Sequence, residues 1–176
     1  MAEPTPSQTV GPYLHIGLTD GVLGPAAVPT DHPGAVVLRG RLIDGAGAPV
    51  PDGMVEAWGA SPAGRYDDPG YRGFARAATD GDGAFELVVL KPGRVPAPDG
   101  APQAPHVAVG VFARGLLKRL ATRVYFPDEP EANAQDPVLA LLAPAERATL
   151  VAVADDGCLR FDIRLQGAGQ TTFFAV

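Results

Sequence analysis

Few side chains in this sequence of 176 residues could carry out chemistry. There is one cysteine, Cys158, and the three histidines, His15, His32 and His106, lie far apart. A single thiol cannot form an internal disulfide, and it excludes a zinc site rich in cysteine. A histidine-rich metal site would need all three histidines. The chain therefore has little equipment of its own for metal or nucleophilic chemistry.

The other candidate residues each have a structural interpretation. The run Asp80-Gly-Asp-Gly lacks the further ligands of an EF-hand loop, so it indicates a type I′ hairpin instead of a calcium site. Cys158 has no histidine close in sequence, which favours a buried structural thiol. His106 at the start of an expected strand and Tyr66 in an expected loop are more typical of packing than of ligand binding.

Arginine supplies 12 of the 14 basic residues, and Arg114 is the one whose position is of interest. Arg114 lies at the end of an expected strand, and its planar guanidinium would suit either a surface ion pair or a bound carboxylate. The segment 114–119 is a small basic cluster, but the net charge of -6 and the pI near 4.9 argue against nucleic-acid binding. Glu56, on a short strand, would need an arginine partner if that face of the strand is buried.

These residues are carried by a chain of short strands and turns. It has 22 glycines and 19 prolines, and its 46% hydrophobic content is typical of a folded domain. Two short helices are expected, beginning at Pro137 and Pro144. Strands are expected over residues 36–43, 54–58, 85–90, 106–112, 119–126, 150–153 and 159–165, with a hydrophobic alternation that is clearest in the last. The pattern predicts an all-β fold, an antiparallel β-sandwich or barrel with irregular loops.

The N-terminal residues 1–35 are rich in proline and glycine and lack a clear period. Their apolar residues favour a segment that wraps a surface, followed by a β-sandwich domain over 36–176. No apolar run approaches the roughly 20 residues of a membrane span, and the first residues do not resemble a signal peptide. We therefore expect a cytoplasmic protein without a membrane or nucleic-acid partner.

Short motifs occur in order along nearly the whole chain. They lie at residues 5–13, 40–51, 56–58, 64–66, 91–93, 104–106, 112–115, 122–126, 160–167 and 172–174. Each motif alone is weak, but in this combination the chain resembles the intradiol ring-cleaving dioxygenases, and among them the alpha chains of two-chain enzymes. The resemblance implies a β-sandwich core and assembly with a homologous beta chain in a larger oligomer.

The resemblance also implies where a metal site would be. Family members hold a non-haem ferric ion with two tyrosines and two histidines. The catecholic substrate chelates this iron, O₂ is inserted, and the ring opens between the hydroxyl-bearing carbons. Carried onto this sequence, the four ligand positions are Tyr66, Val95, His106 and Ala108. Valine and alanine offer no lone pair, so the resemblance implies no metal in this chain, which would be inactive alone, and Fe(III) in the partner beta chain.

The same resemblance gives this chain a place in its partner's substrate pocket. Arg114 matches an arginine that supplies a counter-charge to the carboxylate of a small aromatic substrate. The N-terminal segment that would line the pocket contains Thr9, Gly11, Pro12 and Tyr13. Whether Thr9 or His15 contacts substrate stays open. The alternative is a non-enzymatic binding module, because β-sandwiches also serve carbohydrate and protein recognition.

Overall fold

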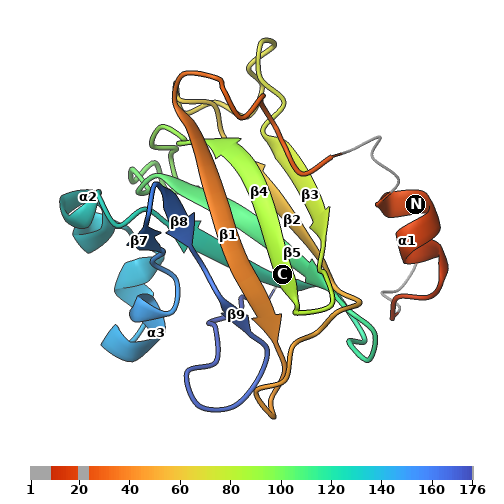
Figure 1. Cartoon of the computed structure of the whole chain (residues 1–176). Helices are drawn as coiled ribbons and strands as arrows, with labels where there is room; N and C mark the ends of the chain where they lie inside the picture. Colours follow the sequence, from red (N-terminus) through yellow and green to blue (C-terminus); the bar gives the residue numbers. More distant parts are fainter. Residues whose placement is uncertain (1–8, 20–23, 176) are drawn as a thin grey trace, which may run out of the picture.

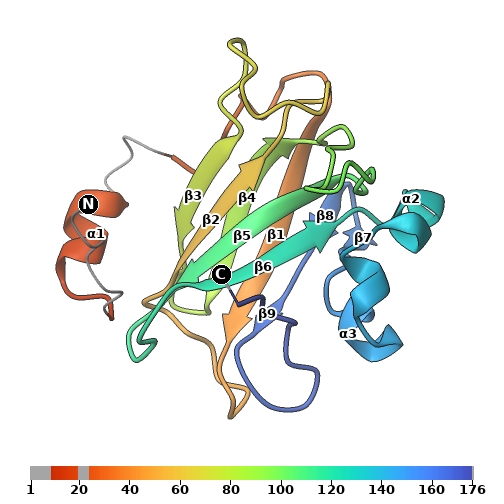
Figure 2. The same cartoon turned by 180° about the vertical axis from the view of Figure 1, so that it is seen from behind.

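The computed structural model describes residues 9–19 and 24–175. Within these residues nine strands form two sheets that pack face to face (Figures 1 and 2). The first sheet has the strand order β4-β1-β8-β7, with β9 also paired to β1, and the second has the order β3-β2-β5-β6. This arrangement confirms the predicted all-β sandwich.

Most neighbouring strands are antiparallel, whereas β1 pairs in parallel with β8 and β9. The first sheet consists of β1 (Ala35–Ile43), β4 (Ala84–Leu90), β7 (Val153–Asp155), β8 (Cys158–Arg160) and β9 (Ile163–Arg164). The second consists of β2 (Met54–Gly59), β3 (Phe74–Ala78), β5 (His106–Phe112) and β6 (Leu120–Tyr125). The helical segments are α1 (Tyr13–Leu18), α2 (Pro130–Gln135), η1 (Leu139–Leu141) and α3 (Pro144–Ala148). In the described part of the chain, no helix has the length and apolar character to cross a membrane.

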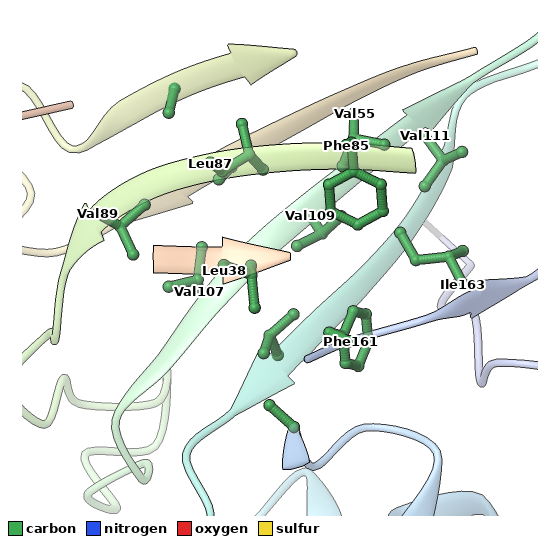
Figure 3. Close-up of a cluster of buried hydrophobic side chains, with 14 of the residues drawn as sticks. Leu38, Val55, Phe85, Leu87, Val89, Val107, Val109, Val111, Phe161 and Ile163 are labelled. Atoms are coloured by element: carbon green, nitrogen blue, oxygen red, sulfur yellow. The ribbon is translucent and has the colours of Figure 1, made fainter. Parts of the chain in front are cut away.

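The core fills the space between the two sheets and follows the two-residue period of the strands. In β5, Val107, Val109 and Val111 are buried in this core, so Ala108 lies on the opposite face. Aliphatic and aromatic side chains of β4 and the C-terminal strands complete the core (Figure 3). The outward face of the second sheet is therefore free to carry polar side chains.

The prediction of a type I′ hairpin at Asp80 is wrong. The Asp80–Gly83 turn connects β3 in one sheet to β4 in the other, and Gly83 alone among its residues has a positive φ, +69°. The Asp80 carboxylate closes this turn by accepting hydrogen bonds from two backbone N–H groups, of Asp82 at 2.9 Å and Ala84 at 2.8 Å. A two-residue turn with both φ values positive, as type I′ requires, occurs instead at Asp156 and Gly157 between β7 and β8.

The strand predicted over 159–165 keeps its alternation but is divided into β8 and β9. At the break, the backbone N–H of Arg41 donates to the Asp162 carboxylate at 3.1 Å instead of to a backbone carbonyl. Cys158, at the start of β8, is partly exposed, and its thiol lies 2.8 Å from the Asp155 carbonyl oxygen. The prediction of a buried thiol was therefore wrong.

The N-terminal segment divides into two described parts. Residues 24–28 lie along the edge of β4, where Ala27 N–H donates to the Val88 carbonyl at 2.8 Å and Val28 is buried. Helix α1 lies to the side of the sandwich, beyond β3 (Figures 1 and 2). Its last residue, Leu18, accepts a hydrogen bond from the Arg76 guanidinium at 3.2 Å. The segment that was expected to wrap a partner therefore partly covers its own sheet, while wrapping by α1 stays a prediction.

Candidate functional site

The Tyr66 loop is held against the segment that follows β4. Gly93 N–H donates to the Ser61 carbonyl at 3.0 Å, and a Cβ on Gly93 would lie 2.4 Å from the Pro62 carbonyl oxygen. Gly64 has φ +74°, and a Cβ there would lie 2.3 Å from the Arg94 carbonyl oxygen. Two backbones approach so closely that only glycine fits at both positions. This explains the Gly-x-Tyr and Lys-Pro-Gly motifs as a structural clamp.

All four positions that match metal ligands of the family lie around Arg123. Ala108 is its direct cross-strand partner in the β5–β6 ladder. The charge of Arg123 lowers the pKa values of Tyr66 and His106, although burial dominates at both and raises the pKa of Tyr66 on balance. Val95 is linked through Gln103, whose backbone N–H donates to the Val95 carbonyl and whose side-chain oxygen accepts from Arg123 at 2.7 Å. Ala108, His106 and Tyr66 are therefore neighbours of Arg123, and Val95 is connected to it through Gln103.

A ferric ion does not fit this site. Val95 is only 6% exposed and fills its position with an apolar side chain, and Ala108 adds no donor atom. Arg123 adds a fixed positive charge, which opposes a cation. Across the described ranges, histidine, cysteine and acidic side chains form no group of three that could hold a metal.

His106 is held as a structural group. Its Nδ1 lies 2.8 Å from the Ala104 carbonyl, which can only accept, so this nitrogen carries the proton and donates. Burial, followed by the charge of Arg123, lowers the pKa of His106 to about 4. The ring packs 5.5 Å from that of Tyr125, whose hydroxyl donates to the fully buried Asp136 at 3.2 Å. Burial raises the pKa of Tyr125 to about 12. Both rings are therefore uncharged near neutral pH.

Of the predicted substrate-pocket residues, Thr9 and Arg114 lie together at the β5–β6 loop, away from the four ligand positions. Thr9 Oγ1 accepts a hydrogen bond from Gly115 N–H at 3.3 Å, which places it next to Arg114. The Arg114 guanidinium pairs with Asp52 at 2.9 Å, yet 80% of its side chain is exposed. Gly11 and Pro12 lead into α1, and the first residue of that helix, Tyr13, is 80% exposed. The side chain of His15 lies outside the described part of the structure.

The two sets of residues lie at opposite ends of β5. His106 is the first residue of this strand, and Arg114 comes two residues after its last. A strand of seven residues, at about 3.3 Å each, separates them by roughly 23 Å. A single small aromatic molecule cannot reach across that distance. The exposed set around Arg114 therefore does not belong to the remnant metal site of the same chain.

A cavity of about 490 Å³ lies over the outward face of the second sheet. Sequence reasoning missed it, because its wall forms only when β2, β5 and β6 lie side by side. Glu56 on this wall is paired with Arg76, with 2.8 Å between Oε1 and Nε, as expected of a partly buried glutamate. The other lining residues include Trp58, Phe74, Ala108, Arg119, Arg123 and Phe174.

A wider hollow of about 920 Å³ lies over the first sheet. Its wall carries side chains of both signs, among them Arg39 and Glu86, which form an ion pair at 2.7 Å. None of the residues predicted for the metal or substrate site lines it. The wall contains four arginines and five carboxylates, so neither sign of charge dominates it, and we assign no function to this hollow.

Comparison with known proteins connects these features to a family. A family model described as Dioxygenase matches residues 19–167. The chain is 43% identical, over 194 residues, to the protocatechuate 3,4-dioxygenase alpha chain of Pseudomonas putida, covering 97% of this chain and 95% of that one. It is 31% identical to the beta chain of the Burkholderia cepacia enzyme, covering 77% of this chain and 66% of that one. The solved dioxygenase domain from Streptomyces sp. SirexAA-E superposes with a TM-score of 0.64 at 27% identity, covering 94% of this chain and 100% of that domain.

Proposed function

This chain belongs to the intradiol ring-cleaving dioxygenase family, and from that premise we propose that it is the alpha-type subunit of a two-chain protocatechuate 3,4-dioxygenase. The complex would cleave protocatechuate with O₂ to 3-carboxy-cis,cis-muconate, a step of aromatic degradation in the beta-ketoadipate pathway. Both oxygen atoms enter the product, so no reductant is needed. We expect the complex in the cytoplasm.

The observation that carries this proposal is the separation of the two residue sets along β5. The remnant metal site lacks two donor side chains and contains the positive charge of Arg123. The set around Arg114 lies at the other end of the strand, where 80% of its side chain is exposed. Arg114 and its neighbours are suited to bind substrate, but they lie far from the metal position of their own chain. Their location is explained if they complete a site in another chain.

The division of labour follows from the side chains. We assign the Fe(III) to a homologous beta chain, where it would activate the substrate ring toward O₂. In this chain the Arg114 guanidinium would bind the substrate carboxylate, because its ion pair with Asp52 leaves 80% of the arginine side chain exposed. Helix α1 would pack on the partner, because Tyr13 and Ile16 are 80% and 68% exposed and offer an apolar surface.

The proposal is tested by purifying the chain alone and after co-expression with a beta-type chain. We expect no bound iron and no ring cleavage from the chain alone, measured by elemental analysis and by loss of substrate absorbance. The co-purified complex should contain iron and cleave protocatechuate. An iron-loaded, active assembly of this chain alone would overturn the proposal.

The same preparation distinguishes the alternative, a non-enzymatic binding module. Such a module would form no stable complex with a beta-type chain and would leave ring cleavage by that chain unchanged. A stable complex with increased activity would exclude it.

A further inference from the structure

The cavity over the second sheet has the size of a small-molecule site. Its volume of about 490 Å³ lies within the usual range for ligand pockets. β5 lines it with Ala108, Val109 and Gly110, and room for a ligand exists because Ala108 and Gly110 have little or no side chain. A family histidine in place of Ala108 would occupy part of this space.

The cavity wall carries an excess of positive charge, and the buried carboxylate of Asp136 is connected to Arg123 only through the Tyr125 hydroxyl. Arg119 and Arg123 both line it, and neither forms an ion pair within the described residues. Arg123 is oriented by neutral groups, the Gln103 side-chain oxygen at 2.7 Å and the Tyr125 hydroxyl at 3.3 Å. Glu56, the carboxylate in the wall, is already paired with Arg76. In a chain of net charge -6, this is a local site for an anion.

The remaining walls are aromatic. Trp58 packs edge-on against Phe74, with 5.8 Å between ring centroids, and 49% of Trp58 is exposed at the cavity. On the other side, the Arg123 guanidinium lies 5.8 Å from the centroid of Phe174. Exposed rings and an oriented guanidinium favour a flat ligand that can stack and also carry a negative charge.

We propose that this cavity binds a small aromatic carboxylate, with the carboxylate on Arg123 and Arg119 and the ring beside Trp58. The inference goes beyond the proposed function, because the ligand is held by this chain itself and no metal takes part. It also accounts for an arginine at the centre of a site in which two of the four metal-ligand positions have no donor side chain.

Trp58 provides a direct readout, since it is the single tryptophan of the chain. The full-length chain is titrated with benzoate, and Trp58 fluorescence is followed. Benzamide, which has the same ring without the charge, and acetate, which has the charge without the ring, are matched controls. We expect a saturable change with benzoate and at least about 10-fold weaker binding of both controls.

Two variants change the cavity by different means. Arg123→Gln removes the charge, and Ala108→Leu fills the space while leaving both arginines in place. Each should weaken benzoate binding by about 10-fold or more, whereas Arg39→Gln, on the outward face of the other sheet, should leave it unchanged. The proposal is overturned if benzoate gives no saturable change, if benzamide binds equally well, or if Ala108→Leu, shown to be folded by circular dichroism, binds like the parent chain.

Discussion

Replacing Arg114 should affect stability and activity to different extents, which distinguishes a structural role from a role in substrate binding. Its ion pair with Asp52 is 2.9 Å long, but 80% of the arginine side chain is exposed. An exposed ion pair contributes only about 0.2–1 kcal/mol to stability, because solvent screens it. Replacing Arg114 with alanine should therefore lower the free energy of unfolding by less than about 1 kcal/mol, measured by urea denaturation of the chain.

The effect on ring cleavage should be larger. If Arg114 binds the substrate carboxylate, the variant loses a charge-assisted hydrogen bond worth about 1.5–3 kcal/mol. Since each 1.36 kcal/mol corresponds to about a factor of ten, kcat/KM of the assembled complex for protocatechuate should fall about 10- to 100-fold. Catechol, which has no carboxylate, should be affected much less.

Asp52→Ala is the matched control for this experiment. It removes the same ion pair and leaves the Arg114 guanidinium free, so kcat/KM should change little. Arg39→Ala removes an exposed ion pair on the other sheet and should leave kcat/KM unchanged. If Arg114→Ala leaves kcat/KM unchanged, or if Asp52→Ala causes an equal loss, Arg114 does not bind substrate and the reasoning fails.

Two further predictions concern the remnant site. Burial lowers the pKa of His106 to about 4, whereas the unfolded chain has a histidine pKa near 6.5, so the unfolded state binds this proton first. The stabilisation that comes from the neutral His106 should therefore be complete above about pH 6.5, and the free energy of unfolding should fall by up to about 3 kcal/mol as the pH drops toward 4. Urea denaturation at several pH values should show a shallower pH dependence for His106→Gln than for the parent chain. Parallel pH curves for the two proteins would contradict this. Gly93→Ala would bring a Cβ within 2.4 Å of the Pro62 carbonyl oxygen and should destabilise the chain by about 1–3 kcal/mol. Gly81→Ala is the control, because a Cβ there has no atom within 4 Å and should not destabilise the chain. Equal denaturation midpoints for the two variants would show that the close approach at Gly93 does not require glycine.

Much of the sandwich could be predicted from the sequence because alternation is local. The strand predicted over 106–112 matches β5 at both ends, since its valines recur at every second residue. β3 was not predicted, because Phe74-Ala-Arg-Ala-Ala contains three alanines and no β-branched residue. Its strand conformation comes from pairing with β2, which the sequence of β3 alone does not indicate. α1 was also missed, because it is short and contains Gly17.

The candidate site was predictable only as far as the family motifs reach. The positions of Tyr66, Val95, His106 and Ala108 came from resemblance, and the structure brings them together around Arg123. The role of Arg123 could not be read from its own segment, because it depends on the β5–β6 register that places it opposite Ala108. The cavity beside it likewise requires three strands and the C-terminal Phe174 to be in place.

The most direct test of the central claim is the iron content of complexes in which one chain is changed at a time. The claim is that this chain completes a site whose metal is held entirely by its partner. A complex with a partner that lacks its own metal ligands should contain no iron, whereas a complex with His106→Ala and Tyr66→Phe in this chain should retain all of it. Iron that persists without the partner's ligands, or that disappears with the two substitutions in this chain while the complex stays assembled, would contradict the account.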